Sequence, residues 1–141
     1  MADFEFIDHT DEVKDKTEEA ILIALEACGI QCQSHAIKNL KSKMTTSGTG
    51  RLAKSITHEV DREEKCAIIG SNVEYAIYNE FGTGRYAADG SGRKTPWVYV
   101  DDEGVGHKTH GMKPKHFLRD ALMNHREEYK GIFKKYLSLL K

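Results

Sequence analysis

Three histidines that lie close together in the sequence are the first candidates for chemistry. His107, His110 and His116 fall within ten residues, and imidazole nitrogen is a common zinc ligand. A zinc site needs three or four ligands at suitable spacing, and this stretch has no cysteine and no His-Glu-x-x-His motif. The pattern favours solvated loop histidines. A small metal-dependent module that uses this cluster stays as an alternative function.

The other chemical motifs are weak. No Gly-x-Ser-x-Gly nucleophile elbow is present. The segments Gly48–Arg51 and Gly82–Arg85 are rich in glycine, but neither has the Gly-x-x-x-x-Gly-Lys-Ser/Thr pattern of a phosphate-binding loop. The acidic pairs at 63–64 and 101–102 fall in predicted turns, where solvated carboxylates are common. We therefore expect no enzymatic activity and no cofactor.

Cysteine usage indicates buried thiols. Cys28, Cys32 and Cys66 are odd in number, and nothing in the sequence suggests export, so a disulfide framework is a poor interpretation. Cys28 and Cys32 are four residues apart and share one helical face, where small thiols suit a protein core.

Size and charge limit the function classes. The 141 residues and 15.9 kDa fit a single domain over residues 1–141. With 21 Lys+Arg against 22 Asp+Glu, a strongly basic nucleic-acid binder is not expected. A small nucleic-acid-binding module stays as a further alternative, because Arg85, Arg93 and Lys94 lie near Tyr86 and Trp97. Short apolar runs and an acidic N-terminus predict no membrane span, no signal peptide and a cytoplasmic site of synthesis.

The elements that must position these residues follow from hydrophobic periodicity. Residues 1–14 read as a loose arm, and 15–44 as a long helix. After a flexible break come two strands of a hairpin at 56–60 and 65–70, then a short helix at 73–81 that ends at Gly82. A flexible loop covers 82–95, strands follow at 96–100 and 105–109, and a long helix covers 115–139. The predicted class is α+β: a long N-terminal helix, a small antiparallel sheet with a long loop, and a long C-terminal helix.

The predicted N-terminal helix carries two apolar stripes. The broad stripe suits the core and consists of Ile21, Leu22, Leu25, Cys28, Cys32, Ala36 and Leu40. The second stripe repeats every seven residues, lies well round the helix, and consists of Ile23, Ile30, Ile37 and Met44. A second stripe indicates packing on something else, which is either more of the same chain or another subunit.

Three ordered motifs carry a family resemblance. Residues 75–84 read Tyr-Ala-Ile-Tyr-Asn-Glu-Phe-Gly-Thr-Gly, residues 49–56 read Thr-Gly-Arg-Leu-Ala-Lys-Ser-Ile, and residues 111–122 read Gly-Met-Lys-Pro-Lys-His-Phe-Leu-Arg-Asp-Ala-Leu. Together they resemble the small tail-completion and head–tail joining (neck) proteins of long-tailed bacteriophages and prophages. Each motif is short, and the ordered set is the specific feature.

The resemblance implies a structural, homo-oligomeric ring, hexameric in the family, that acts in virion assembly. The implied partners are further copies of the chain, the tail tube protein and a head–tail connector or stopper protein. Genomic DNA passes through the lumen without sequence-specific contact, and no membrane is involved. The implied location is the tail or neck of the virion, assembled in the cytoplasm of the bacterial host.

Two candidate sites follow. The second apolar stripe of the N-terminal helix is the candidate subunit interface, and ring contacts of this kind are heterologous. The candidate assembly loop is an arm towards a neighbour or the lumen and comprises Glu80, Phe81, Gly82, Thr83, Gly84, Arg85, Arg93 and Lys94. Asn79 and Glu80 stand at the root of this loop, where they could cap a helix or bridge to a neighbour.

Overall fold

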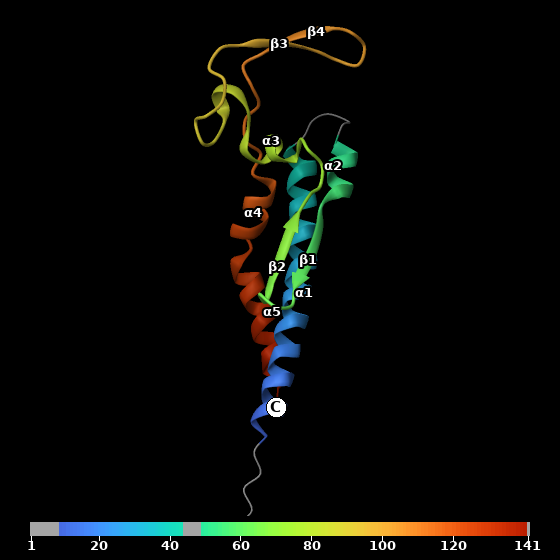
Figure 1. The fold of residues 1–141 in the computed structure, drawn as a ribbon, viewed down its shortest axis with the longest axis vertical. Coiled ribbons are helices and arrows are strands. Elements are labelled where there is room, and N and C mark those ends of the chain that lie inside the picture. Colours follow the sequence, from blue (N-terminus) through green and yellow to red (C-terminus); the bar gives the residue numbers. More distant parts are fainter. Residues whose placement is uncertain (1–8, 44–48, 141) are drawn as a thin grey trace, which may run out of the picture.

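The computed structural model describes residues 9–43 and 49–140 and confirms the α+β class. Figure 1 shows an elongated body built along the long helix α1 (Thr10–Lys43), with a β-hairpin held away from the body at one end. The body also contains α2 (Thr49–Ser55), β1 (Thr57–Asp61), β2 (Cys66–Gly70), α4 (Phe117–Met123) and α5 (Arg126–Ser138). The distal part contains α3 (Ala76–Phe81), the short 3₁₀ helix η1 (Gly84–Tyr86), β3 (Trp97–Val100) and β4 (Gly106–Thr109).

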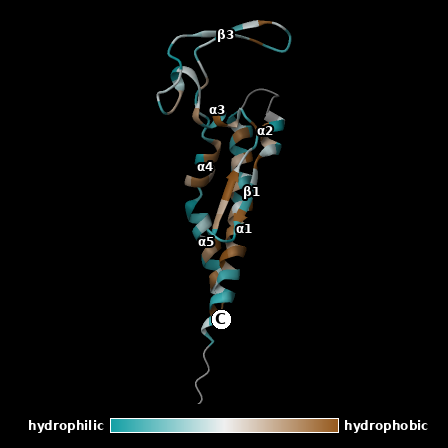
Figure 2. Ribbon diagram, viewed as in Figure 1, coloured by the Kyte–Doolittle hydropathy of each residue, from teal (hydrophilic) through white to brown (hydrophobic). Residues whose placement is uncertain are grey.

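Helix α1 organises the core. Its broad apolar stripe is confirmed in its central part, where Cys28, Cys32, Ala36 and Leu40 are buried. These side chains meet α2, the start of β1, and α4, whose Phe117 is fully buried. Figure 2 shows the same concentration of apolar residues in the middle of α1 and in β2. Thus α1 is the element on which the other parts of the body pack.

The helix also begins earlier than predicted. Residues 10–14, assigned to a loose arm by the sequence, form the first turns of α1, and residues 1–8 lie outside the described part of the chain. Asp11 and Glu12 stand in the first turn, where acidic side chains interact favourably with the helix dipole. The sequence pattern does not predict these turns as helix, because they are polar and show no apolar periodicity.

The first hairpin is as predicted. Strands β1 and β2 pair antiparallel from Thr57 with Gly70 to Asp61 with Cys66. In the turn, Asp61 Oδ1 accepts the backbone N–H groups of Glu63 and Glu64 at 3.0 Å each. The hairpin packs on α1. Its His58 ring lies against Gly29, where an added Cβ would come within 2.8 Å of the ring, so a glycine inside the helix permits this contact.

Three other predictions need correction. The segment before β1 is the helix α2, which is too short to show a periodic pattern. The strands form two separate two-stranded sheets, β1–β2 and β3–β4, rather than one small sheet. The C-terminal helix is two helices, α4 and α5, interrupted at Asn124 and His125.

The break between α4 and α5 has a tertiary cause. Helix α4 packs on α1 through the buried Phe117 and Ala121, and α5 packs on a more N-terminal part of α1. The Tyr129 hydroxyl donates across the break to the Ala121 carbonyl oxygen at 2.5 Å. Two short helices can therefore follow α1 where one straight helix would diverge from it.

By length and hydropathy alone, α1 could also cross a membrane. An 18-residue window of α1 has a mean hydropathy of 1.3, and 33% of that window is buried inside the protein. Core helices pass the same test, and α1 packs against α2, α4, α5, β1 and β2. The packing favours a core helix, and the absence of a membrane partner stays a prediction.

Candidate functional site

A buried carboxylate joins the distal part of the chain to the body. Glu80, at the end of α3, is only 5% exposed. Its Oε2 accepts the backbone N–H of Leu118 at 2.8 Å, and its Oε1 accepts that of Arg119 at 2.9 Å. These N–H groups belong to the first turn of α4, where no carbonyl oxygen of the same helix is available to accept them. Glu80 therefore caps α4 from 38 residues away, and the charge lies at the favourable end of the helix dipole.

Backbone hydrogen bonds extend this joint in both directions. The carbonyl oxygens of Asn79 and Glu80 accept the N–H groups of Lys115 and His116 at 2.8 and 3.2 Å. Further along, Thr83 N–H donates to the Met112 carbonyl oxygen at 2.8 Å, and Thr83 Oγ1 accepts the Met112 N–H at 2.9 Å. The segments 79–83 and 112–116 are thereby fixed side by side.

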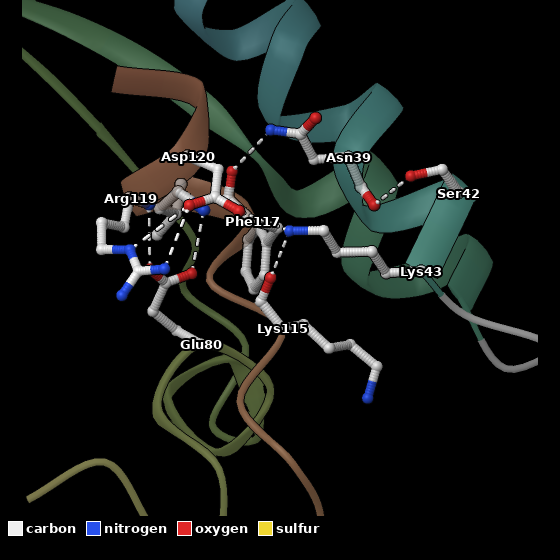
Figure 3. A network of polar contacts seen from close by, with 9 residues as sticks. Asn39, Ser42, Lys43, Glu80, Lys115, Phe117, Arg119 and Asp120 are labelled. Carbon is white, nitrogen blue, oxygen red and sulfur yellow. Dashed lines mark hydrogen bonds and ion pairs between the residues drawn. The ribbon is translucent and has the colours of Figure 1, made fainter. Parts of the chain in front are cut away.

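The end of α1 holds the same joint from the other side (Figure 3). Lys43 Nζ donates to the Lys115 carbonyl oxygen at 2.7 Å and pairs with Asp120 Oδ2 at 2.6 Å. Asn39 Nδ2 donates to the Phe117 carbonyl oxygen at 3.3 Å. The hydrogen bond from Lys43 is the main cause that lowers the pKa of Asp120. Helix α1, α3 and α4 thus meet at one polar junction above the core.

Two glycines allow the chains at the joint to approach closely. Gly82 has φ of 78° and Gly84 has φ of 61°, and such positive φ values are unfavourable for residues that have a Cβ. A Cβ at Gly82 would lie 2.8 Å from the Met112 carbonyl oxygen and from the Pro114 ring. A Cβ at Gly84 would clash with the His110 carbonyl oxygen. Gly82 at the end of α3 and Gly84 at the start of η1 therefore allow the chain to pack closely against residues 110–114.

The structure divides the candidate assembly loop into two groups. Glu80, Gly82, Thr83 and Gly84 form the joint through hydrogen bonds and close approaches to residues 110–119. The solvent-facing group contains Phe81, Arg85, Arg93 and Lys94. Arg85 lies 5.1 Å from the centre of the Tyr86 ring, and Arg93 lies 5.8 Å from that of Trp97, so these guanidinium groups are partly held by aromatic rings.

An uncovered apolar face lies beside the joint. Ile77, Tyr78 and Phe81 project from α3, and each is more than half exposed. With the chain from Gly82 to Gly92 they line a groove of about 690 Å³. The sequence predicts a short helix at 73–81, but its pattern does not show that this apolar face points outward.

The distal hairpin, β3–β4, is uncovered as well. Its strands pair from Trp97 with Thr109 to Val100 with Gly106, and Figure 1 shows it beyond the end of the body. Val98 and Val100 are 66% and 67% exposed, and Tyr99 is half exposed. An isolated two-stranded hairpin is at best marginally stable in water. Tyr99 stacks on the His107 ring within the hairpin, whereas Val98 and Val100 form an exposed apolar surface.

The second stripe of α1 is only partly exposed. Ile23 and Ile30 are 45% and 51% exposed, whereas Ile37 packs against the core cluster. Met44 lies outside the described residues. Ile30 lines a small groove between α1 and α5 together with Ile132 and Tyr136. The candidate interface on α1 therefore reduces to Ile23 and Ile30.

His107, His110 and His116, which the sequence left as an alternative metal cluster, are not grouped as possible ligands among the described residues. His107 Nε2 lies 2.7 Å from Asp101 Oδ2, and this contact is the main cause that lowers the pKa of Asp101. The histidines that do come together within residues 9–43 and 49–140 are His35 and His125, beside Glu128. Only the spacing of His125 and Glu128, three residues apart on a helix, was visible in the sequence.

A comparison with protein families identifies the chain. Residues 4–82 match the HK97-gp10-like family model, described as "Bacteriophage HK97-gp10, putative tail-component". The match covers more than half of the chain, including the whole motif at 49–56 and residues 75–82 of the motif at 75–84, and it ends at Gly82, inside the joint. Searches of curated proteins and of solved structures gave no match. The chain therefore belongs to the HK97-gp10-like family of bacteriophage tail components, which gives it a structural role in a phage tail, in association with other virion proteins.

Proposed function

We propose that this chain forms a homo-oligomeric ring that completes the phage tail or joins it to the head. The observation that supports the proposal is the distal hairpin, in which Val98 and Val100 are exposed on an arm held away from the body. Apolar strands are stabilised when another surface covers them. In a ring of identical subunits, that surface belongs to the next copy of the chain.

Ring closure requires two different surfaces on each subunit. One is the arm (residues 82–112), together with the uncovered face of α3 at its base. The other is the exposed part of the α1 stripe at Ile23 and Ile30, which lies along the body rather than at its distal end. Contacts between unlike surfaces repeat around a ring, whereas contacts between like surfaces end at a dimer.

The distal part of the chain is almost neutral, because residues 82–113 also carry Asp89, Asp101, Asp102 and Glu103. Its basic side chains are all exposed and available to contact DNA: Arg85, Arg93, Lys94, Lys108 and Lys113. We infer that these charges face the lumen, where they interact with phosphates without reading the base sequence. The tail tube protein and a connector or stopper protein are the proposed axial neighbours.

Co-sedimentation with polymerised tail tubes from the same phage, followed by electron microscopy, tests the proposal. Extra ring-shaped density at one tube end is the expected result, and it also gives the polarity of binding. Folded protein that neither binds tubes nor forms rings with the connector protein would refute the proposed role.

Point variants test the two surfaces. We expect Ile30→Asp, and separately Val98→Ser with Val100→Ser, to abolish ring density while the circular dichroism spectrum stays native. Ile68→Asp is a matched control, because Ile68 is 54% exposed on the outer side of the first hairpin and belongs to neither surface. Equal loss in the control would show that the effect is not specific to the proposed contacts.

A further inference from the structure

A second polar cluster lies on the body, one helical turn along α1 from Asn39 of the joint. His35 comes from the middle of α1, His125 from the break between α4 and α5, and Glu128 from the first turn of α5. His35 Nε2 lies 2.8 Å from Glu128 Oε2, and His125 Nδ1 lies 3.4 Å from the same oxygen. The two imidazole rings are stacked, with centroids 3.5 Å apart and planes 4° from parallel.

We propose that His35, His125 and Glu128 bind a divalent first-row transition metal ion, with Zn²⁺ as the representative ion. Two imidazole nitrogens and one carboxylate oxygen are a common donor set for zinc, with water in the open position. The three ligand atoms all lie within 4.8 Å of one another. This inference is independent of the proposed ring function.

The distances suit such a site. Zinc–nitrogen and zinc–oxygen bonds of about 2.0–2.2 Å place neighbouring ligands of a tetrahedral ion about 3.3 Å apart. The measured separations from Glu128 Oε2, 2.8 and 3.4 Å, lie on either side of that value. The two rings are stacked with nearly parallel planes, so both side chains must rotate out of the stack before their nitrogens face one ion.

Burial also suits a metal site with an open position. The side chains of His35, His125 and Glu128 are 16%, 33% and 38% exposed, so an ion and its water have access from one side. The nearby thiols of Cys28 and Cys32 are not part of the donor set. Burial raises the pKa of both thiols, which disfavours the thiolate form that binds zinc.

The ion would act as a cross-link. It would connect the middle of α1 to the α4–α5 break, across 90 residues of sequence from His35 to His125. A ligand that binds only the folded chain stabilises it by mass action. At a free zinc concentration of about 100 times Kd, we expect the melting temperature to rise by about 5–10 °C.

The test uses tag-free, full-length protein treated with chelator and then titrated with Zn²⁺ or Co²⁺. The expected results are one ion per chain by calorimetry, the rise in melting temperature, and visible absorption bands of Co²⁺ held by nitrogen and oxygen ligands. We expect His35→Gln and Glu128→Gln to weaken Zn²⁺ binding at least about tenfold, because even outer-shell changes have effects of that size. His107→Gln is the matched control and keeps the wild-type affinity.

Two results would overturn the proposal. One is the absence of any Zn²⁺ effect on the melting temperature of the wild-type protein. The other is a Zn²⁺ affinity that stays at the wild-type value in both His35→Gln and Glu128→Gln. If His35→Gln does not fold, Glu128→Gln decides, because that carboxylate is the most exposed of the three ligands.

Discussion

Replacement of Glu80 gives the sharpest test of the joint. The carboxylate is 5% exposed and accepts two backbone N–H groups of α4. Hydrogen bonds to charged groups contribute about 1.5–3 kcal/mol each, and a buried donor left without a partner costs about 1–3 kcal/mol. Loss of an ordinary N-cap costs about 0.5–2 kcal/mol. Because water enters the space left by the side chain, we expect Glu80→Ala to lower the free energy of unfolding by about 3 kcal/mol.

The isosteric variant separates charge from shape. Glu80→Gln keeps one acceptor oxygen but turns an NH₂ group towards one of the two N–H groups, so we expect a loss of about 2 kcal/mol. The assay is urea unfolding followed by circular dichroism, with the slope m compared among variants. Glu74→Ala is the control, because Glu74 is exposed near the start of the same helix, and surface changes usually stay within about 0.5 kcal/mol. A loss below about 0.5 kcal/mol for Glu80→Ala would refute the view that this carboxylate holds α4 in place.

Three further changes probe the core and the joint. Phe117→Ala removes a fully buried ring and should cost about 3–5 kcal/mol by urea unfolding, whereas Leu122→Ala, at a half-exposed side chain, should change little. Gly82→Ala introduces a Cβ at φ of 78° and should cost about 2–3 kcal/mol in the same assay, so a neutral result would contradict the described turn. The folded-state pKa of Asp120 is lowered by Lys43, so its contribution to stability is present above the unfolded pKa of about 3.9 and is lost as the pH falls through the folded pKa. Urea midpoints of wild type and Asp120→Asn should accordingly differ at pH 7 and converge below about pH 4, and a constant difference would exclude the ion pair as the cause.

The sequence predicted the parts of the fold whose pattern is long and local. The stripe from Cys28 to Leu40 spans several helical turns, so its period shows which face is buried. In the first hairpin, residues 56–60 alternate apolar and polar, residues 66–70 form a short apolar run, and an acidic turn lies between the two strands. Gly82 ends α3 as expected, because φ of 78° is readily available to glycine.

The remaining elements depend on tertiary contacts that no local pattern shows. The break at His125 contains neither proline nor glycine, and it follows from the way α4 and α5 each pack on α1. The strands form two separate sheets because β3 and β4 lie beyond the end of the body, away from β1 and β2. Strand propensity alone does not predict this separation. The cluster of His35 and Glu128 joins residues 93 positions apart, beyond the reach of spacing arguments.

The joint also explains why its motifs are short. Glu80 binds the backbone N–H groups of Leu118 and Arg119 rather than their side chains, so the cap itself does not restrict the residue type at either position, although Leu118 also packs against the core. Only a few positions are constrained in residue type: the carboxylate itself, the glycine that approaches 112–114, and the Phe117 ring that fills the core. The motif around Glu80 and the motif around Phe117 are therefore two halves of one structure.

That structure bears on assembly because it fixes the arm relative to the body. The arm leaves the body at Gly82 and returns at about Met112. Two hydrogen bonds between Thr83 and Met112 join the outgoing and the returning segment. A surface on the arm can meet a neighbouring subunit at a defined angle only if this connection is rigid. Weakening the joint at Glu80 should therefore impair ring formation even where the fold of the body survives, while leaving the apolar contact residues of the arm unchanged. An Ile30→Asp variant should impair the same assembly with the joint intact, so the two defects are separable by measuring stability and ring density on the same samples.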